Sequence, residues 1–254
     1  MKLCRSSSTS TVAVARSGRR GLVIGVGPIS VLSPVQDRFL RGFFADPDRP
    51  FYLSGGTALS AFYLRHRYSD DLDFFTRDPE NLRAADRYIR EGAAAAGLQI
   101  ERVARRGDLL QYFFSGDPAP AHALVKSELM VDVPPYFADP RPFDGIKVDD
   151  LFSIALNKIA CLGRREPKDY VDLYLILQSG RYTLQDLIPR AKEKELGLDE
   201  LTIGADFHAV DTLPRLVEFQ QDYMIVTLDL AEMRRFYREW AGRLFDLLPP
   251  RREA

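Results

Sequence analysis

The sequence contains few of the residues that build disulfide frameworks or zinc sites. Its 254 residues include three histidines and two cysteines, Cys4 and Cys161, which lie far apart in the chain. No CxxC spacing or Cys/His cluster is present, so we expect free thiols in a reducing compartment and no zinc centre. No run approaches the roughly 20 consecutive apolar residues that span a bilayer. We therefore expect a cytoplasmic protein without a membrane partner.

An excess of charge of one sign is also absent. The 35 lysines and arginines balance 36 aspartates and glutamates, which leaves a formal net charge of −1. No overall positive field is available to attract nucleic acid, so any contact with RNA must come from a local patch. Apolar residues form 46% of the chain, which is enough for an ordinary globular core.

Regular patterns begin at residue 33. Residues 1–32 are rich in Ser, Thr, Arg and Gly, and they predict a flexible tail or an extension outside the folded domain. Residues 33–148 mix helical periodicity with short apolar strands, whereas residues 149–254 show helical periodicity only. The sequence therefore predicts an α+β fold, in which a core with a mixed β-sheet flanked by helices precedes a helical C-terminal domain.

The expected elements follow from apolar periodicity and from capping residues. Ser33 and Pro34 predict the start of a first helix, as an N-cap followed by proline at the first helical position. Further helices are expected at residues 57–65, 79–97, 149–163, 167–179, 183–194 and 229–247. Strands are expected at residues 51–53, 72–76, 100–105, 109–114 and 123–133.

Two aspartates on one predicted strand are the first candidate site residues. In Asp71-Leu72-Asp73, the two-residue period of a strand places both carboxylates on one face, about 7 Å apart along the strand. Leu72 then points into the core. Paired carboxylates suit Mg²⁺, which prefers oxygen ligands. We expect Asp71 and Asp73 to be metal ligands with a catalytic role.

A third carboxylate on a neighbouring strand would complete a two-metal site for in-line phosphoryl transfer. Asp132 lies among apolar residues in the predicted strand 123–133. A buried aspartate costs several kcal/mol unless it is paired or coordinated. We therefore predict that Asp132 is the third metal ligand and a candidate general base.

A glycine pair precedes the aspartates. Gly55 and Gly56 end one predicted strand and open a helix, and glycines allow backbone N–H groups to approach an anion closely. Ser54 and Thr57 could add hydroxyl donors. Each motif alone is common in turns and at strand edges. The combination of the glycine turn with the paired aspartates predicts a phosphate-binding turn beside a metal-binding strand.

The motifs in combination resemble a known family. LSGGTAL at residues 53–59 and HRxSxDLDFF at residues 66–75 resemble the AbiEii-type toxins of the polymerase-β-like nucleotidyltransferase superfamily. LNKIA at residues 156–160 and RxxxKDYVDL at residues 164–173 are similar to that family's downstream lysine and KDxxD motifs. The resemblance covers residues 33–180 and identifies the expected core, residues 33–148, as a nucleotidyltransferase core.

The resemblance implies roles for the motif residues. Gly55 and Gly56 would hold a nucleoside triphosphate (NTP), and Lys158 would neutralise phosphate charge. Asp169 and Lys168 would be accessory polar groups. We include Lys158 and Asp169 among the candidate catalytic residues. The candidate nucleotide-binding residues are Ser54, Gly55, Gly56, Thr57, Arg67, Ser69 and Lys168.

The expected function is transfer of a nucleoside monophosphate (NMP) from an NTP to an acceptor hydroxyl through Mg²⁺. The resemblance implies the toxin of a toxin–antitoxin or abortive-infection pair, with RNA as a plausible acceptor and a cognate antitoxin as a partner. Two alternatives stay open: a catalytically silent binding module of the same fold, and an enzyme that modifies small aminoglycoside-type molecules. An acidic pocket would favour the aminoglycoside acceptor, and a basic groove would favour RNA.

Overall fold

The computed structural model describes residues 31–106, 109–116 and 124–248. The predicted N-terminal tail, apart from its last two residues, lies outside this part of the chain. The described strands form one sheet of seven, in the order β3-β4-β5-β2-β1-β7-β6. Their bounds are β1 Tyr52–Ser54, β2 Asp71–Thr76, β3 Gln99–Arg106, β4 Leu109–Ser115, β5 Val125–Val131, β6 Arg141–Phe143 and β7 Ile146–Val148.

Strand β2 lies at the centre of this sheet. It runs antiparallel to β1 and parallel to β5. Strand β5 is in turn antiparallel to β4, which is antiparallel to β3. The sheet is therefore mixed, and the predicted α+β class is confirmed.

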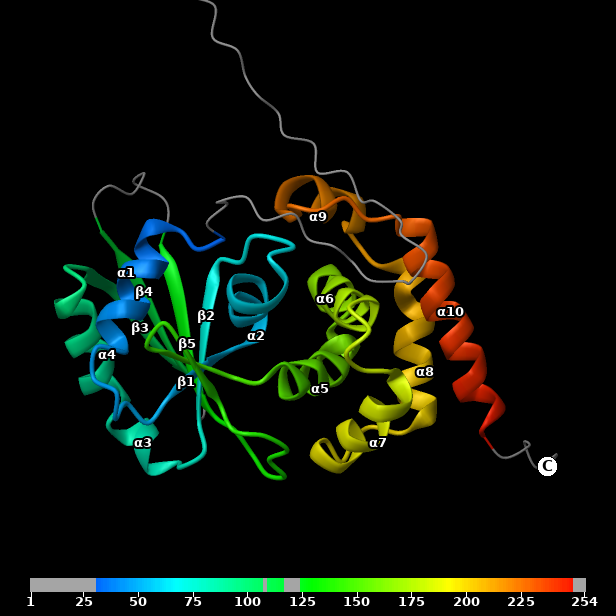
Figure 1. Cartoon of the computed structure of the whole chain (residues 1–254), viewed down its shortest axis with the longest axis horizontal. Helices are drawn as coiled ribbons and strands as arrows, with labels where there is room; N and C mark the ends of the chain where they lie inside the picture. The colour runs from blue at the N-terminus through cyan, green and yellow to red at the C-terminus, as the bar shows by residue number, and fades with distance from the viewer. Residues whose placement is uncertain (1–30, 107–108, 117–123, 249–254) are drawn as a thin grey trace, which may run out of the picture.

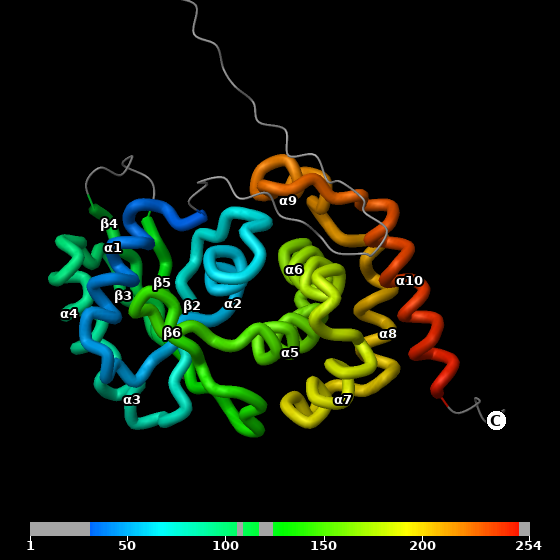
Figure 2. Tube along the Cα trace, in the orientation of Figure 1, coloured from blue at the N-terminus to red at the C-terminus, as the bar shows by residue number. Residues whose placement is uncertain are grey.

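Helices lie on both sides of the sheet (Figure 1). The N-terminal helices α1 and α4 cover one side, while α2 and the helices from α5 onward gather on the other, as the tube trace also shows (Figure 2). The α-helices are α1 Pro34–Phe43, α2 Gly55–Ala58, α3 Glu80–Arg83, α4 Ala85–Ala95, α5 Leu151–Cys161, α6 Pro167–Gln178, α7 Leu184–Lys194, α8 Glu200–His208, α9 Leu216–Tyr223 and α10 Leu230–Asp246. A π-helix, η1 Leu59–Leu64, and the 3₁₀ helices η2 Leu162–Arg164 and η3 Ala209–Thr212 complete the described elements.

An aromatic cluster fixes which face of β2 is buried under α1. Helix α1 begins with a capping box, in which the Ser33 hydroxyl accepts from the backbone N–H of Gln36. Phe43 on this helix packs against Phe74 of β2, with 4.7 Å between ring centroids. Because strand side chains alternate, the residues next to Phe74 point to the other face. That face carries the paired aspartates and looks toward the helical half.

Several elements differ from the sequence expectations. The helix predicted for residues 79–97 is two helices, α3 and α4, separated at Ala84. The helix predicted for residues 57–65 begins earlier, at Gly55, and continues as a π-helix. Strands β6 and β7 and helices α8 and α9 have no counterpart among the predicted elements. No helix in the described ranges combines the length and the apolar character needed to cross a membrane.

Candidate active site

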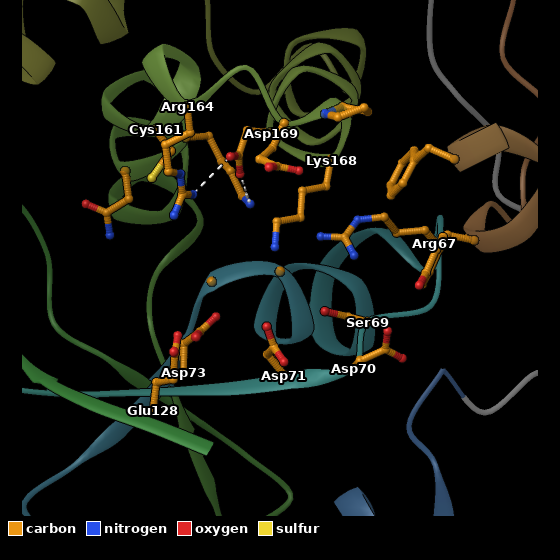
Figure 3. Close-up of a pocket in the computed structure, with 18 of the residues that line it drawn as sticks. Arg67, Ser69, Asp70, Asp71, Asp73, Glu128, Cys161, Arg164, Lys168 and Asp169 are labelled. Atoms are coloured by element: carbon orange, nitrogen blue, oxygen red, sulfur yellow. Dashed lines mark hydrogen bonds and ion pairs between the residues drawn. The ribbon is translucent and has the colours of Figure 1, made fainter. Parts of the chain in front are cut away.

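A pocket of about 850 Å³ lies between the sheet and the C-terminal helices. Strands β2 and β5 form one wall, from which Asp71, Asp73 and Glu128 project (Figure 3). The turn at Gly55 and Gly56 lines the pocket beside them. Residues of α5, α6 and α9 line the opposite side. The pocket therefore lies where the two predicted halves of the chain meet, which is a common location for ligand sites.

Three carboxylates line the strand wall. Asp71 and Asp73 lie on the same face of β2, whereas Leu72 between them is fully buried on the other face. The parallel register places Glu128 of β5 opposite Asp73 and Lys126 opposite Asp71. Partners in a strand pair project from the same face of the sheet. The structure therefore brings Asp71, Asp73 and Glu128 together in one pocket (Figure 3).

This arrangement concentrates negative charge. Burial raises the pKa of Asp73 to about 6, and the nearby charges of Asp71 and Glu128 raise it in the same direction. The ammonium group of Lys126 lies 2.9 Å from Asp71 and 3.2 Å from Glu128. Among the described residues, no group of three acidic, histidine or cysteine side chains is already arranged as a metal centre. Oxygen donors with excess negative charge nevertheless suit a divalent cation such as Mg²⁺.

The glycine turn packs directly against these carboxylates. Gly55 has a φ of +67°, which favours glycine, and any Cβ there would collide with the carboxylate of Asp73. A Cβ on Gly56 would collide with the guanidinium of Arg67. Gly55 is therefore required by its φ and by the carboxylate of Asp73, whereas a side chain at Gly56 would displace the guanidinium of Arg67.

The two hydroxyls beside the glycines are already hydrogen-bonded within the protein. Ser54 donates to a carboxylate oxygen of Asp149 at 2.7 Å, and Thr57 donates to the backbone carbonyl of Asp71. Thr57 thereby attaches α2 to β2. These contacts position the turn, so the amide groups of Gly55 and Gly56 remain as its candidate phosphate donors.

Lys158 of α5 lies in a buried ion-pair network. Its ammonium group is 2.8 Å from Asp169 and 2.7 Å from Asp172, both fully buried on α6. Burial lowers the pKa of Lys158, but these two carboxylates outweigh that effect and hold the pKa above its usual value. Asp169 also accepts from Arg164 at 2.9 Å. Asp169 therefore positions two cations at the pocket.

Asp172 is the centre of this network, and the sequence did not single it out as a site residue. Arg67 donates to both of its carboxylate oxygens, at 2.7 and 2.8 Å, and His66 contacts it at 2.7 Å. Burial raises the pKa of Asp172, but the charges of Arg67 and Lys158 hold it well below its usual range. Burial lowers the pKa of His66, so its imidazole is neutral at pH 7 and has a structural role.

Lys168 and Ser69 project into the pocket. Figure 3 shows the Lys168 side chain reaching toward the strand that carries Asp71. Within the described part of the chain, Lys168 has no ion pair and the Ser69 hydroxyl has no hydrogen-bond partner. Both groups are therefore available to a ligand. The backbone carbonyl of Ser69 accepts from Gln36 at 2.7 Å, which fixes this segment to α1.

The structure does not bring Asp132 to the pocket. Strand β5 ends at Val131, and the backbone N–H of Asp132 donates to Thr76 at the far end of β2. The Asp132 carboxylate accepts from Tyr52 at 2.6 Å and from Lys194 at 2.7 Å. It lines a separate cavity of about 130 Å³. The third carboxylate beside Asp71 and Asp73 is Glu128, and the sequence prediction of Asp132 was wrong in position.

Comparison with known proteins places these motifs in a family. The family described as nucleotidyl transferase AbiEii toxin, of type IV toxin–antitoxin systems, matches residues 38–250. The chain belongs to the AbiEii family. It is accordingly a nucleotidyltransferase, and the resemblance seen in the sequence motifs is confirmed. No curated protein matches the chain.

Solved structures share the fold of this AbiEii-family chain. JHP933 from Helicobacter pylori is 18% identical, with a TM-score of 0.54 over 84% of this chain and 89% of that one. MenT4, a nucleotidyltransferase toxin from Mycobacterium tuberculosis H37Rv, is 15% identical, with a TM-score of 0.54 over 84% of this chain and 83% of that one. At these identities the likeness concerns the fold.

Proposed function

We propose that this AbiEii-family chain transfers an NMP from an NTP to a hydroxyl group of an RNA, in a reaction that depends on Mg²⁺. One observation carries the proposal: Asp71, Asp73 and Glu128 share a pocket with the glycine turn, opposite a set of cations. The type IV toxin–antitoxin description of the family supports a toxin with a cognate antitoxin as its partner, and the exposed Arg164 at the pocket supports an acceptor that carries phosphate groups.

The strand wall would hold the metal. Asp71 and Asp73 would provide its oxygen ligands, with Glu128 beside them. Lys126 forms ion pairs with Asp71 and Glu128, so we expect its ammonium group to move aside when a cation binds. Bound Mg²⁺ would supply charge neutralisation for the phosphates and would lower the pKa of the acceptor hydroxyl.

The remaining residues would bind and orient the triphosphate. The amides of Gly55 and Gly56 would donate to phosphate oxygens, and Ser69 and Lys168 would add donors from the pocket wall. The positive charge of Lys158, held by Asp169 and Asp172, would stabilise the charge that develops on the pyrophosphate. These contacts would hold the α-phosphate beside Asp71 and Asp73.

The transfer reaction needs no reactant other than the NTP and the acceptor hydroxyl. The acceptor oxygen forms a bond to the α-phosphorus while the bond from that phosphorus to the bridging oxygen breaks, and pyrophosphate leaves. Glu128 is the candidate base for the hydroxyl proton, because its carboxylate lies beside the two aspartates. Arg164 has a side chain 57% exposed at the pocket, where its guanidinium can meet a backbone phosphate of the RNA.

The test is a transfer assay with position-specific labels. The full chain is incubated with total RNA, Mg²⁺ and each NTP, labelled on either the α- or the γ-phosphate. We expect label in RNA from the α-phosphate only, and none with EDTA or with Asp71→Asn. Transfer of the γ-label would show a kinase, and absence of both labels with every NTP would contradict the proposal.

A further inference from the structure

Helix α9 forms a wall of the pocket that differs in chemistry from the side that carries Lys158, Arg164 and Lys168. Four of its residues line the pocket: Glu218, Phe219, Asp222 and Tyr223. They form two i, i+4 pairs, one of carboxylates and one of aromatic rings. Residues with this spacing lie on one face of a helix. One face of α9 thus presents both kinds of side chain to the pocket.

The aromatic pair is packed and held in place. The rings of Phe219 and Tyr223 are stacked, with centroids 5.4 Å apart and planes 17° from parallel. The guanidinium carbon of Arg67 lies 6.0 Å from the Phe219 ring centroid. The backbone N–H of Tyr68 donates to the carbonyl of Tyr223 at 2.9 Å. The wall is therefore attached to the segment that leads into β2. Tyr223 itself remains 37% exposed to solvent.

The carboxylates indicate which part of a ligand this wall suits. Glu218 and Asp222 are exposed, and neither forms a hydrogen bond or an ion pair within the described residues. Two unpaired carboxylates repel phosphate, whereas they accept hydrogen bonds from amino groups. Aromatic rings stack on the flat face of a nucleobase. Arg215, at the start of the helix and also in the pocket, could donate to a carbonyl of the base.

We infer that the α9 wall binds the nucleobase of the incoming NTP, an assignment that rests on the proposed function. The base stacks on Tyr223, and its exocyclic amino group donates to Asp222 or Glu218. Figure 3 shows Asp73 and Glu128 at one end of the pocket and Arg67 and Ser69 at the other, next to this wall. As the candidate base, Glu128 must lie next to the acceptor hydroxyl, so the acceptor occupies the end of the pocket that contains Glu128. The end next to α9 is then left for the nucleotide. The wall therefore selects amino-bearing bases over uracil.

The experiment measures nucleotide binding apart from transfer. Isothermal titration calorimetry on the full chain, with Mg²⁺ and without RNA, gives dissociation constants for the four NTPs and for inorganic tripolyphosphate. Tripolyphosphate reports the phosphate site alone. We expect at least one of ATP, CTP and GTP to bind about tenfold more tightly than tripolyphosphate, the equivalent of one stacking contact, and UTP to bind more weakly than that nucleotide.

Two variants and a control test the wall itself. Tyr223→Leu and Asp222→Asn should each weaken binding of the preferred NTP and leave the dissociation constant of tripolyphosphate unchanged. Val217→Ala is the control, because this exposed residue lies on α9 but does not line the pocket. Melting temperatures confirm that each variant is folded, and a variant that unfolds is replaced by Glu218→Gln.

The possible failures can be told apart. The inference is overturned if the wild type binds NTPs and tripolyphosphate with equal affinity, or if the variants lose affinity for both ligands to the same extent. In either case the proposed function stands. Unchanged NTP binding with a higher KM for RNA would assign the wall to the acceptor, which also overturns it. If the wild type binds neither NTP nor tripolyphosphate, the proposed function itself has failed.

Discussion

Gly55 lies against the carboxylate of Asp73, so closely that a Cβ at this position would collide with it. The φ of Gly55, +67°, adds backbone strain for any other residue. Gly55→Ala should therefore cost about 1–2 kcal/mol of stability from the strain and about 1–3 kcal/mol more from overpacking. It should also displace Asp73. Urea unfolding measures the loss of stability, and metal affinity reports the displacement of Asp73.

Gly97→Ala is the matched control for this substitution. Gly97 has a similar φ of +64°, but a Cβ there would meet nothing within 4 Å. It should therefore show the strain cost alone. Equal losses of stability in the two variants would mean that the contact between Gly55 and Asp73 does not constrain the turn.

Asp172 should be essential to stability. It is fully buried and neutralises both Arg67 and Lys158. Asp172→Asn leaves these buried cations short of a counter-charge, so we expect a loss of about 3–5 kcal/mol in the free energy of unfolding. Glu80→Gln, which breaks an exposed pair with Arg83, should cost less than about 1 kcal/mol. Similar losses in both variants would show that the buried network does not stabilise the fold.

Lys158 and Lys168 should respond differently to removal. Lys158 forms ion pairs with two buried aspartates, so Lys158→Ala should lower the free energy of unfolding by about 3 kcal/mol. Lys168→Ala should change stability by less than about 0.5 kcal/mol and weaken NTP binding by about 1.5–3 kcal/mol. Thermal unfolding and calorimetric titration measure the two effects. Unchanged nucleotide affinity in Lys168→Ala would remove that residue from the proposed site.

Metal binding should depend on pH through Asp73. Its pKa is raised to about 6, and a proton competes with the metal for the ionised carboxylate. Affinity for Mn²⁺ or Mg²⁺ should therefore be constant well above pH 6 and fall by up to about tenfold per unit below it. A profile that is flat between pH 7 and pH 5 would contradict this.

The same shift predicts the stability of the metal-free protein. Because the pKa of Asp73 is higher in the folded state than in the unfolded one, the folded state binds the proton more tightly. Stability therefore falls as pH rises from about 4 to about 6. Asp73→Asn should remove this loss, so the metal-free variant should gain about 3 kcal/mol over the wild type at pH 7.5. If the stability difference between Asp73→Asn and the wild type is the same at pH 7.5 as at pH 4, the raised pKa of Asp73 is ruled out.

The sequence predicted the elements whose signals are local. The capping residue Ser33, the alternation in β2 and the glycine turn each depend on a few neighbouring residues, and each expectation agrees with the described elements. Helix α9 was missed because much of its first turn is exposed and it buries only Leu216. Its apolar periodicity is correspondingly weak. The division of the chain after residue 148 stays a prediction.

The error at Asp132 has a different cause. Glu128 and Asp132 are four residues apart in the same predicted strand, so the alternation of side chains places both on the same face of the sheet. Choosing between them requires the register of β5 on β2, in which Glu128 pairs with Asp73, and the end of the strand at Val131. Both are set by tertiary packing. The network around Asp172 is likewise formed by segments more than 100 residues apart.

The carboxylate pair Glu128 and Asp132 offers the most direct test of the account. Transfer of NMP to RNA is measured at saturating Mg²⁺ for Glu128→Gln and Asp132→Asn, together with the melting temperature of each. We expect Glu128→Gln to lower the rate by at least about 100-fold, as the loss of a base does, while it stays folded. Asp132→Asn should lower the melting temperature, because it weakens the contacts with Tyr52 and Lys194, and should keep the wild-type rate below that temperature. Loss of transfer in Asp132→Asn with full activity in Glu128→Gln would contradict the proposed site.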